Sequence, residues 1–282
     1  MRNYCTLFDS AYLSRGLAMY ESLVKHSSEP FRMFVLAMDN ECELVLGELK
    51  LPGMLIDGIA SLEEELVALK KVKVGRTHQE YCWTMASVYT WFNKTASHLD
   101  EVTYCDADLY FFSNPEQIFD EIGSRSIGII PHRFESPKIA TNGRFNVSWV
   151  TFKCEVGREC LNRWAKQCRE WCFYRVELDR FADQKYLDEW PELYGDEVCE
   201  IQNPGAGLAP WNLQRYRLTD GPKVDGNPVV FYHFHEFAEK PNGRYRLTNY
   251  RLRPEDETLI YYPYINAYDQ AKAKIESARL PA

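Results

Sequence analysis

The stretch VTYCDADLYFFSNP, residues 102–115, combines an apolar, strand-like run with two carboxylates, Asp106 and Asp108. Charged side chains rarely enter a protein core unless a partner or a ligand compensates them. We therefore interpret the stretch as two parts, in which residues 102–105 anchor a strand in a sheet and residues 109–112 pack again beyond it. The two carboxylates then stand where the sheet ends, and a bound cation could offset their charge.

Apolar strand-like runs alternate with helical patterns along the chain on both sides of this stretch. The runs that read as strands are 3–8, 31–39, 51–59, 102–112, 124–134 and 145–153. The helical patterns are 16–26, 42–50, 61–72, 84–96 and 159–172. This alternation predicts an α/β fold with a single central, mostly parallel mixed sheet flanked by helices. The pattern Ser61-x-x-Glu64 predicts a capping box at the start of the third helix.

The end of the chain has a different character from the alternating part. Residues 226–237 (GNPVVFYHFHEF) read as a further strand, and a basic aromatic segment and YYPYINAYDQAKAKIE (261–276) follow. No Pro/Gly/Ser-rich linker divides the chain, so we expect one domain over 1–254 and a C-terminal extension over 255–282 packed on it. Peripheral contact of 261–276 with a membrane is the second interpretation of this end.

Composition limits the classes of partner and the compartment. The 282 residues are 45% apolar and 26% charged with a net charge of −8, which argues against a nucleic-acid surface. No run of about 18 apolar residues or signal-peptide core is present, so we expect a cytoplasmic protein, with the inner face of the membrane as a second location. The nine cysteines are then expected to be reduced thiols, including those of helix 159–172.

Several carboxylates directly follow predicted strands, where ligands collect in open α/β sheets. These are Asp9, Asp39, Asp106 and Asp108. Mn²⁺ and Mg²⁺ prefer oxygen ligands, and Mg²⁺ often binds through one or two carboxylates and a substrate phosphate. His233 and His235 are two residues apart, which places both on one face of a strand, and either could complete such a site. Solvated carboxylates and packed histidines are the structural alternative.

Three polar segments and one basic segment are further candidates, and each also has an ordinary structural explanation. Asp183 and Gln184 lie near a predicted helix start, where Asp is a routine cap. Asn146 opens a strand, and the Gly/Pro-rich segment 203–212 includes Gly205, whose backbone could approach a ligand closely. The basic run 239–253 reads as a solvated face apart from Lys240, which could bind diphosphate oxygens.

The order of these segments resembles GT-A-type nucleotide-sugar glycosyltransferases, most closely the family-8-like branch, from about Tyr4 to Pro241. The segments that carry the resemblance are TLFDSAY (6–12), TYCDADLYFFSNP (103–115), FNVSWVTFK (145–153), ADQKYLDEW (182–190), GAGLAPWN (205–212) and YHFHEFAEKP (232–241). The resemblance implies a single GT-A, Rossmann-like domain. It also implies that Asp9 reads uridine, Tyr12 stacks on the base, and one His and Lys240 close the site.

The implied donor-binding residues are Thr6, Phe8, Asp9, Tyr12, Asp106, Ala107, Asp108, Asn146, Gly205 and Lys240. The implied metal ligands for Mn²⁺ or Mg²⁺ are Asp106, Asp108 and one of His233 and His235, with His233 favoured by its distance from Lys240. Asp183 and Gln184 would line the donor-sugar pocket near the reacting face, and Asp183 and Glu236 are the carboxylates without another role. The expected catalytic residues are therefore Asp183, Gln184 and Glu236. Asn242 after Lys-Pro, and WTMAS (83–87) where the family often has Arg, depart from the pattern and leave the donor sugar open.

The expected function is transfer of a sugar from a nucleoside diphosphate sugar, with UDP favoured, to a hydroxyl of a carbohydrate or lipid-linked acceptor, with retention slightly favoured over inversion. Surface polysaccharide or glycan assembly is the expected setting. One alternative is a sugar-phosphate nucleotidyltransferase, although TLFDSAYLSRG (6–16) lacks the glycines of such a phosphate loop. The other is a non-catalytic carbohydrate-binding protein, suggested by the 14% aromatic content.

Overall fold

The computed structural model describes residues 1–134 and 141–279. In this part of the chain, a seven-stranded sheet has the order β3-β2-β1-β4-β7-β6-β8. The strands are β1 (Arg2–Phe8), β2 (Phe31–Ala37), β3 (Met54–Gly58), β4 (Glu101–Cys105), β6 (Ile127–Pro131), β7 (Phe145–Lys153) and β8 (Val198–Glu200). Only β7 runs antiparallel to its neighbours β4 and β6, and the other pairs are parallel. The predicted mostly parallel mixed sheet is confirmed.

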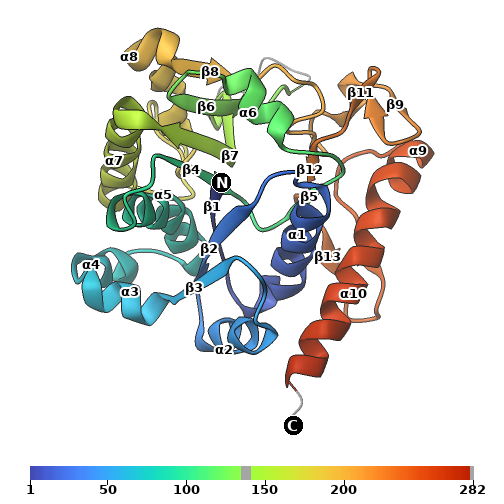
Figure 1. The fold of residues 1–282 in the computed structure, drawn as a ribbon, viewed down its shortest axis with the longest axis horizontal. Helices are drawn as coiled ribbons and strands as arrows, with labels where there is room; N and C mark the ends of the chain where they lie inside the picture. Colours follow the sequence, from blue (N-terminus) through green and yellow to red (C-terminus); the bar gives the residue numbers. More distant parts are fainter. Residues whose placement is uncertain (135–140, 280–282) are drawn as a thin grey trace.

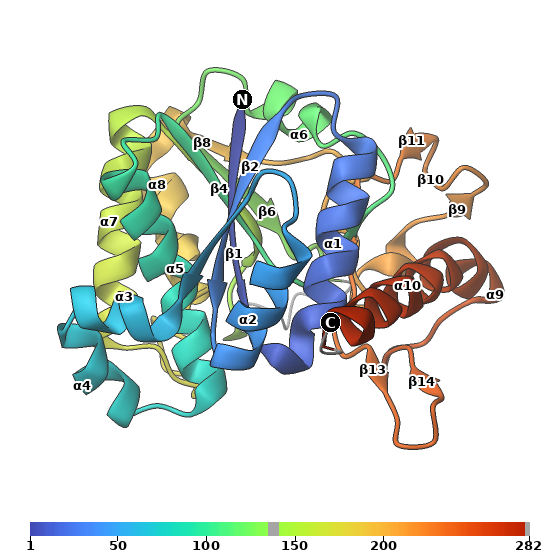
Figure 2. The same ribbon diagram turned by 60° about the horizontal axis from the view of Figure 1, so that its bottom comes forward.

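Helices cover both faces of the sheet, as Figures 1 and 2 show. The helices are α1 (Leu13–His26), α2 (Asn40–Leu49), α3 (Ile59–Glu65), α4 (Ala68–Val74), α5 (His78–Ala96), α6 (Glu116–Ile122), α7 (Cys154–Glu170), α8 (Trp190–Tyr194), α9 (Pro254–Asp256) and α10 (Tyr262–Arg279). Strand β1 is buried on both faces, with Tyr4 and Phe8 in the core under α1 and Cys5 and Leu7 in the core under α5. Such two-sided burial explains its continuous apolar run.

Short strands outside the main sheet build the part of the molecule that follows β8. They are β5 (Leu109–Phe111), β9 (Leu218–Thr219), β10 (Lys223–Val224), β11 (Asn227–Pro228), β12 (Phe231–His233), β13 (Ala238–Glu239) and β14 (Tyr245–Arg246). Residues 102–112 form two elements, as the sequence predicted, and the pairing of β5 with β12 places the second in a different sheet. Helix α10 lies along α1, and Tyr264, Tyr268 and Ile275 enter the same core.

Two predicted element boundaries are wrong. Residues 61–72 do not form one helix that begins at Ser61, because α3 begins after Gly58 and ends at Glu65, before α4. The capping box lies instead at Thr77 and Glu80, where both reciprocal hydrogen bonds are present at the start of α5. The sequence contains the same Ser/Thr-x-x-Glu pattern at both places, and only the second coincides with a helix start.

The predicted strand 226–237 is also wrong as a single element. It contains β11 and β12, and β12 ends at His233, after one more ladder bond in which the Phe234 N–H donates to the Asp108 carbonyl oxygen (2.9 Å). The chain then turns, with Phe237 N–H bonded to the Phe234 carbonyl and Glu236 in the left-handed backbone region (φ +64°). His233 and His235 therefore do not share one strand face.

The state of the cysteines and the hydropathy of the helices agree with what the composition indicated. All nine cysteines are free thiols; Cys160, Cys168 and Cys172 are buried at or near α7, and Cys154 is exposed. Over residues 1–134 and 141–279, no helix combines the length and the apolar character that crossing a bilayer requires.

Candidate active site

The turn between β4 and β5 positions the two carboxylates of the Asp-Ala-Asp motif. Val102 and Cys105 are fully buried and fix β4 in the sheet, while Leu109 and Phe111 are fully buried on the far side of the turn. The Asp106 N–H donates to the Ser148 carbonyl of β7 (3.1 Å), which holds the turn at the edge of the sheet. Ala107 is buried between the two carboxylates.

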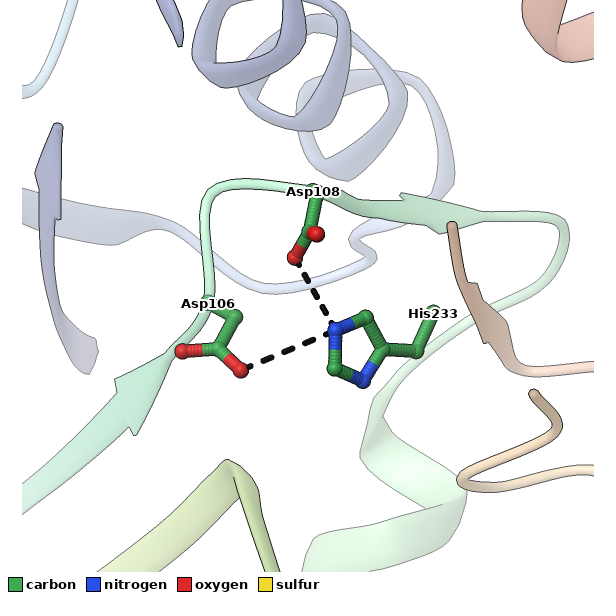
Figure 3. A group of neighbouring side chains, drawn as sticks. All are labelled: Asp106, Asp108 and His233. Atoms are coloured by element: carbon green, nitrogen blue, oxygen red, sulfur yellow. Dashed lines mark ion pairs between the residues drawn. The ribbon is translucent and has the colours of Figure 1, made fainter. Parts of the chain in front are cut away.

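His233 faces these carboxylates from the neighbouring strand, as Figure 3 shows. Pairing of β12 with β5 sets His233 opposite Leu109, directly after the motif. Its Nε2 lies 3.1 Å from Asp108 Oδ1 and 3.9 Å from Asp106 Oδ2. The backbone N–H of His233 donates to the Leu208 carbonyl (2.8 Å), which fixes the backbone at this position, and the Trp211 ring packs edge-on against the imidazole.

The donor atoms of this cluster suit a single divalent ion. One ligand atom from each of Asp106, Asp108 and His233 lies within 4.8 Å of the others. An ion with ligands at about 2.1 Å separates two of them by at most roughly 4.2 Å, and the 3.1 and 3.9 Å separations fall inside that span. Two carboxylate oxygens and one imidazole nitrogen form a set suited to Mn²⁺. His235 lies apart from this group, exposed, with its ring centroid 6.0 Å from that of His233.

Burial and mutual charge set the protonation of the cluster. Burial, opposed by the His233 charge and reinforced by Asp108, raises the pKa of Asp106 to about 6. Burial also opposes ionisation of Asp108, but the charge and hydrogen bond of His233 prevail and lower its pKa to about 2. Burial alone would lower the pKa of His233, yet the two carboxylates raise it. The cluster thus requires positive charge to hold two ionised carboxylates.

Asp9 and Tyr12 lie just beyond the carboxyl end of β1. Asp9 Oδ1 accepts the Tyr12 N–H (3.2 Å) and caps the short turn Ser10–Tyr12, while Asp9 Oδ2 lies 2.8 Å from His78 Nε2 of α5. The Tyr12 ring is 42% exposed, so one flat aromatic surface is accessible beside Asp9. Thr6 and Phe8 point into the protein instead, with 0% and 3% of their surfaces exposed.

Asp39 also follows a strand, but the structure gives it a structural role. Its Oδ1 accepts the Cys42 N–H (2.8 Å) and caps α2. Its Oδ2 accepts the N–H and the hydroxyl of Ser10 (2.9 and 2.8 Å). Asp39 therefore connects the starts of two loops at the carboxyl edge of the sheet.

Asp183 and Asn146 lie deeper, on the side of the sheet edge where β7 begins. Burial raises the pKa of Asp183 well above its ordinary value, and the charge of Asp106 raises it further, so the two carboxyls are close. Asn146 Oδ1 accepts the Ser148 N–H (2.9 Å), and its amide nitrogen lies 3.1 Å from His132 Nε2. Since the Ser148 N–H can only donate, the amide orientation is fixed and His132 Nε2 must accept.

The structure gives four other predicted site residues different contacts. Gln184 donates to the Asn142 carbonyl (2.6 Å), and Lys240 is exposed on the hairpin of β13 and β14. Glu236 accepts the Asn249 N–H (3.1 Å). The Gly205 carbonyl accepts the Val230 N–H (2.8 Å), and an added Cβ would lie 2.0 Å from the Pro228 carbonyl oxygen, so this glycine is required by chain packing.

The sequence interpretation missed residues that join the site through tertiary contacts. His78 binds Asp9, His132 binds Asn146, and Arg15 lies over the Tyr12 ring. A signal existed for His78, because Thr77-x-x-Glu80 marks the start of α5, which the sequence placed at residue 84. Nothing in the local sequence indicates the partners of His132 or Arg15.

Comparison with known proteins gives two curated relatives. No family model matches the chain. The uncharacterized protein YfnF of Bacillus subtilis (strain 168) is 34% identical over 247 residues, covering 82% of this chain and 80% of YfnF. The uncharacterized protein YfnD of the same organism is 30% identical over 292 residues, covering 98% of this chain and 91% of YfnD.

The solved structures that are similar to this chain include two glycosyltransferases. The galactosyltransferase LgtC, solved with donor and acceptor sugar analogues, has a TM-score of 0.58 and 15% identity, covering 99% of this chain and 97% of LgtC. Mouse xyloside xylosyltransferase 1 has a TM-score of 0.53 and 12% identity, covering 86% of this chain and 99% of that structure. The chain therefore belongs to the protein family that includes YfnF and YfnD, and its fold is that of the GT-A glycosyltransferases, as its motifs indicated.

Proposed function

We propose that this protein is a metal-dependent glycosyltransferase that moves a sugar from a nucleoside diphosphate sugar, with UDP favoured, to a hydroxyl of a carbohydrate or lipid-linked acceptor. The observation that carries the proposal is the cluster of Asp106, Asp108 and His233 at the carboxyl end of β4 in a chain with the GT-A fold. Ligands of open α/β sheets bind at this edge. We propose surface polysaccharide or glycan assembly as the setting.

Asp106, Asp108 and His233 would hold Mn²⁺ or Mg²⁺, which would neutralise the negative charge of the departing diphosphate. Asp9 and the exposed Tyr12 ring would bind the nucleoside end. Lys240 is exposed and carries a positive charge that could meet phosphate oxygens as the donor binds. Asp183 and Asn146 would line the pocket of the transferred sugar beside Asp106.

The transfer breaks the bond between the sugar C1 and the diphosphate oxygen, and it forms a bond between C1 and the acceptor oxygen. The acceptor hydroxyl proton leaves as that bond forms, so the products are the nucleoside diphosphate and the glycosylated acceptor. An inverting reaction needs a free carboxylate base. Burial raises the pKa of Asp183 well above its ordinary value and so opposes its ionised form, and Glu236 accepts the Asn249 N–H, which supports a retaining reaction as the proposed outcome.

The test is release of UDP from a panel of UDP-sugars in the presence of Mn²⁺, first with water and then with candidate acceptors. We expect Asp108→Ala to abolish both hydrolysis and transfer while circular dichroism and the unfolding temperature show a folded protein. Asp120→Ala is a matched control, because Asp120 is an exposed carboxylate on α6. Full Mn²⁺-dependent activity in Asp108→Ala would disprove the assignment.

The same preparations separate the alternatives. A nucleotidyltransferase would release pyrophosphate from a nucleoside triphosphate and a sugar phosphate. A carbohydrate-binding protein would bind glycans without metal and leave UDP-sugars intact. Either result, without UDP release, would replace the proposal.

A further inference from the structure

Arg15 lies in the first turn of α1, directly after the Asp9-capped turn that carries Tyr12. Its guanidinium carbon is 4.1 Å from the centroid of the Tyr12 ring. A guanidinium at this distance over an aromatic face is attracted by the ring quadrupole. One face of Tyr12 is thus covered, while 42% of the residue remains exposed.

The same guanidinium reaches a second segment that is distant in sequence. Arg15 Nη2 donates to the Phe237 carbonyl (2.7 Å), and Nη1 donates to the Ala11 carbonyl (3.3 Å). Phe237 is 2% exposed and packs against Tyr245, Tyr264 and Tyr268, so its carbonyl is a fixed anchor. Phe237 also lies between His233 and Lys240 in the chain. Arg15 therefore connects the Tyr12 turn to the segment that carries the His ligand.

Within residues 1–134 and 141–279, no carboxylate lies within salt-bridge distance of the Arg15 guanidinium. Ion pairs with carboxylates are formed in this part of the chain by eight arginines, Arg2, Arg144, Arg158, Arg163, Arg175, Arg180, Arg253 and Arg279, and Arg15 is not among them. The contacts of Arg15 are instead an aromatic ring and two carbonyls, which orient it without neutralising its charge. A charged donor to a carbonyl is among the stronger hydrogen bonds.

A half-exposed aromatic ring with one supported face offers a flat surface to a planar ligand. Without support, the two side-chain torsions of Tyr12 would have to be ordered when the ligand binds, and that ordering weakens binding. Arg15 removes part of this cost before the ligand arrives. The hydrogen bond from Arg15 to the Phe237 carbonyl also fixes the position of the Tyr12 ring relative to the segment after β12.

We propose that Arg15 is a positioning residue for the nucleoside of the donor, which it serves by bracing the Tyr12 ring from the face opposite the bound base. This inference rests on the proposed function, since it takes the planar ligand to be the base of a nucleoside diphosphate. It adds a residue whose effect should appear in the binding of the nucleoside alone, without phosphate or metal.

The experiment measures dissociation constants of uridine without metal, and of UDP with Mn²⁺, by calorimetry on the full chain. We expect Arg15→Gln to weaken uridine binding roughly tenfold, because Gln keeps a donor but loses the cation over the ring. Arg15→Lys, which keeps a cation, should recover most of the affinity. Arg32→Gln is the matched control, because Arg32 also lies over a ring (Phe34, 5.6 Å) and bonds a side chain (Asn3, 3.0 Å), and it should bind like wild type.

A double-mutant cycle shows whether Arg15 acts through Tyr12. In a Tyr12→Ala background, Arg15→Gln should weaken uridine binding by less than about twofold. An equal loss with and without Tyr12 would overturn the inference, as would wild-type uridine affinity in folded Arg15→Gln. If the wild-type protein binds UDP and the affinity of Arg15→Gln is the same as that of the wild type, this inference alone is refuted. Wild-type protein that binds neither uridine nor UDP would refute the proposed function and this inference together.

Discussion

Two carboxyl environments lie at the carboxyl edge of the sheet, the half-buried Asp106–Asp108 pair and the buried Asp183, and the pKa values of Asp108 and Asp183 shift in different directions. At the β4–β5 turn, His233 lies against Asp108 and lowers its pKa to about 2 despite burial. At Asp183, burial and the nearby Asp106 charge act together and raise the pKa. Desolvation is thus outweighed where a cation is at hand, which lowers the carboxyl pKa, and is unopposed at Asp183, where the pKa rises. Under the proposed function, the first environment would hold a metal ion and the second would hydrogen-bond the transferred sugar.

The largest expected difference is between the two histidines. We expect His233→Gln to reduce Mn²⁺-dependent release of UDP at least about 100-fold, because the buried carboxylates lose the imidazole that faces them. His235→Gln should stay within about threefold, since His235 lies outside the cluster and is exposed. Initial rates at several Mn²⁺ concentrations measure both. Equal losses in the two variants would remove the distinction between the histidines.

Metal binding should distinguish the two carboxyl environments through stability. A ligand at about 100 times its dissociation constant stabilises a folded protein by about 2.7 kcal/mol. We expect Mn²⁺ to raise the unfolding temperature of the wild type and of Asp183→Asn by several degrees, and to leave Asp106→Asn nearly unchanged. Differential scanning fluorimetry with Mn²⁺ and with chelator measures the shift. A shift that survives in Asp106→Asn but disappears in Asp183→Asn would reverse the assignment.

The smallest expected effect is the stability gained when Asp183 is made permanently neutral. Burial raises the pKa of Asp183, so its ionised form is disfavoured in the folded protein, and Asp183→Asn, which does not ionise, should unfold at a higher temperature without metal, by about 2–4 °C per kcal/mol. The same variant should lose transfer activity, because the amide replaces one carboxyl oxygen with an N–H donor group and so changes the hydrogen bonds offered to a bound sugar. A less stable, fully active Asp183→Asn would contradict both expectations.

The pH dependence of that gain has a defined sign. The folded-state pKa of Asp183 is raised above its ordinary value of 3.8, so its contribution to stability is complete below that value and is lost as pH rises through the folded-state pKa. The advantage of Asp183→Asn in urea unfolding should therefore vanish in acid and grow with pH. An advantage that is constant across pH would show that packing, not ionisation, is its cause.

Local sequence patterns predicted the regular part of the fold well. Strand β7 has the predicted bounds, Phe145–Lys153, and each of its residues except the last is buried. The β4–β5 division was predicted because two carboxylates interrupt an otherwise apolar run. The start of α5 was missed because the Ser/Thr-x-x-Glu pattern occurs more than once, and hydropathy does not show which copy caps a helix.

The candidate site was predicted less completely, because several of its contacts join distant segments. The spacing of His233 and His235 suggested one strand face, whereas β12 ends at His233 and the chain turns at Phe234–Phe237. Gly205 was expected to approach a ligand, but the structure places it against Pro228. Arg15 and His132 have no local motif, since their partners Phe237 and Asn146 come from other elements.

The sequence by itself determined which strands end in carboxylates and that these strands form one sheet, because burial on both faces leaves a continuous apolar run that a polar turn must end. Only the tertiary structure decided which side chains meet beyond those ends. Antiparallel pairing of β12 with β5 aims His233 at Asp106 and Asp108, and the turn after it carries His235 away. Pairing between distant segments depends on packing of the whole chain, so no local pattern could specify it.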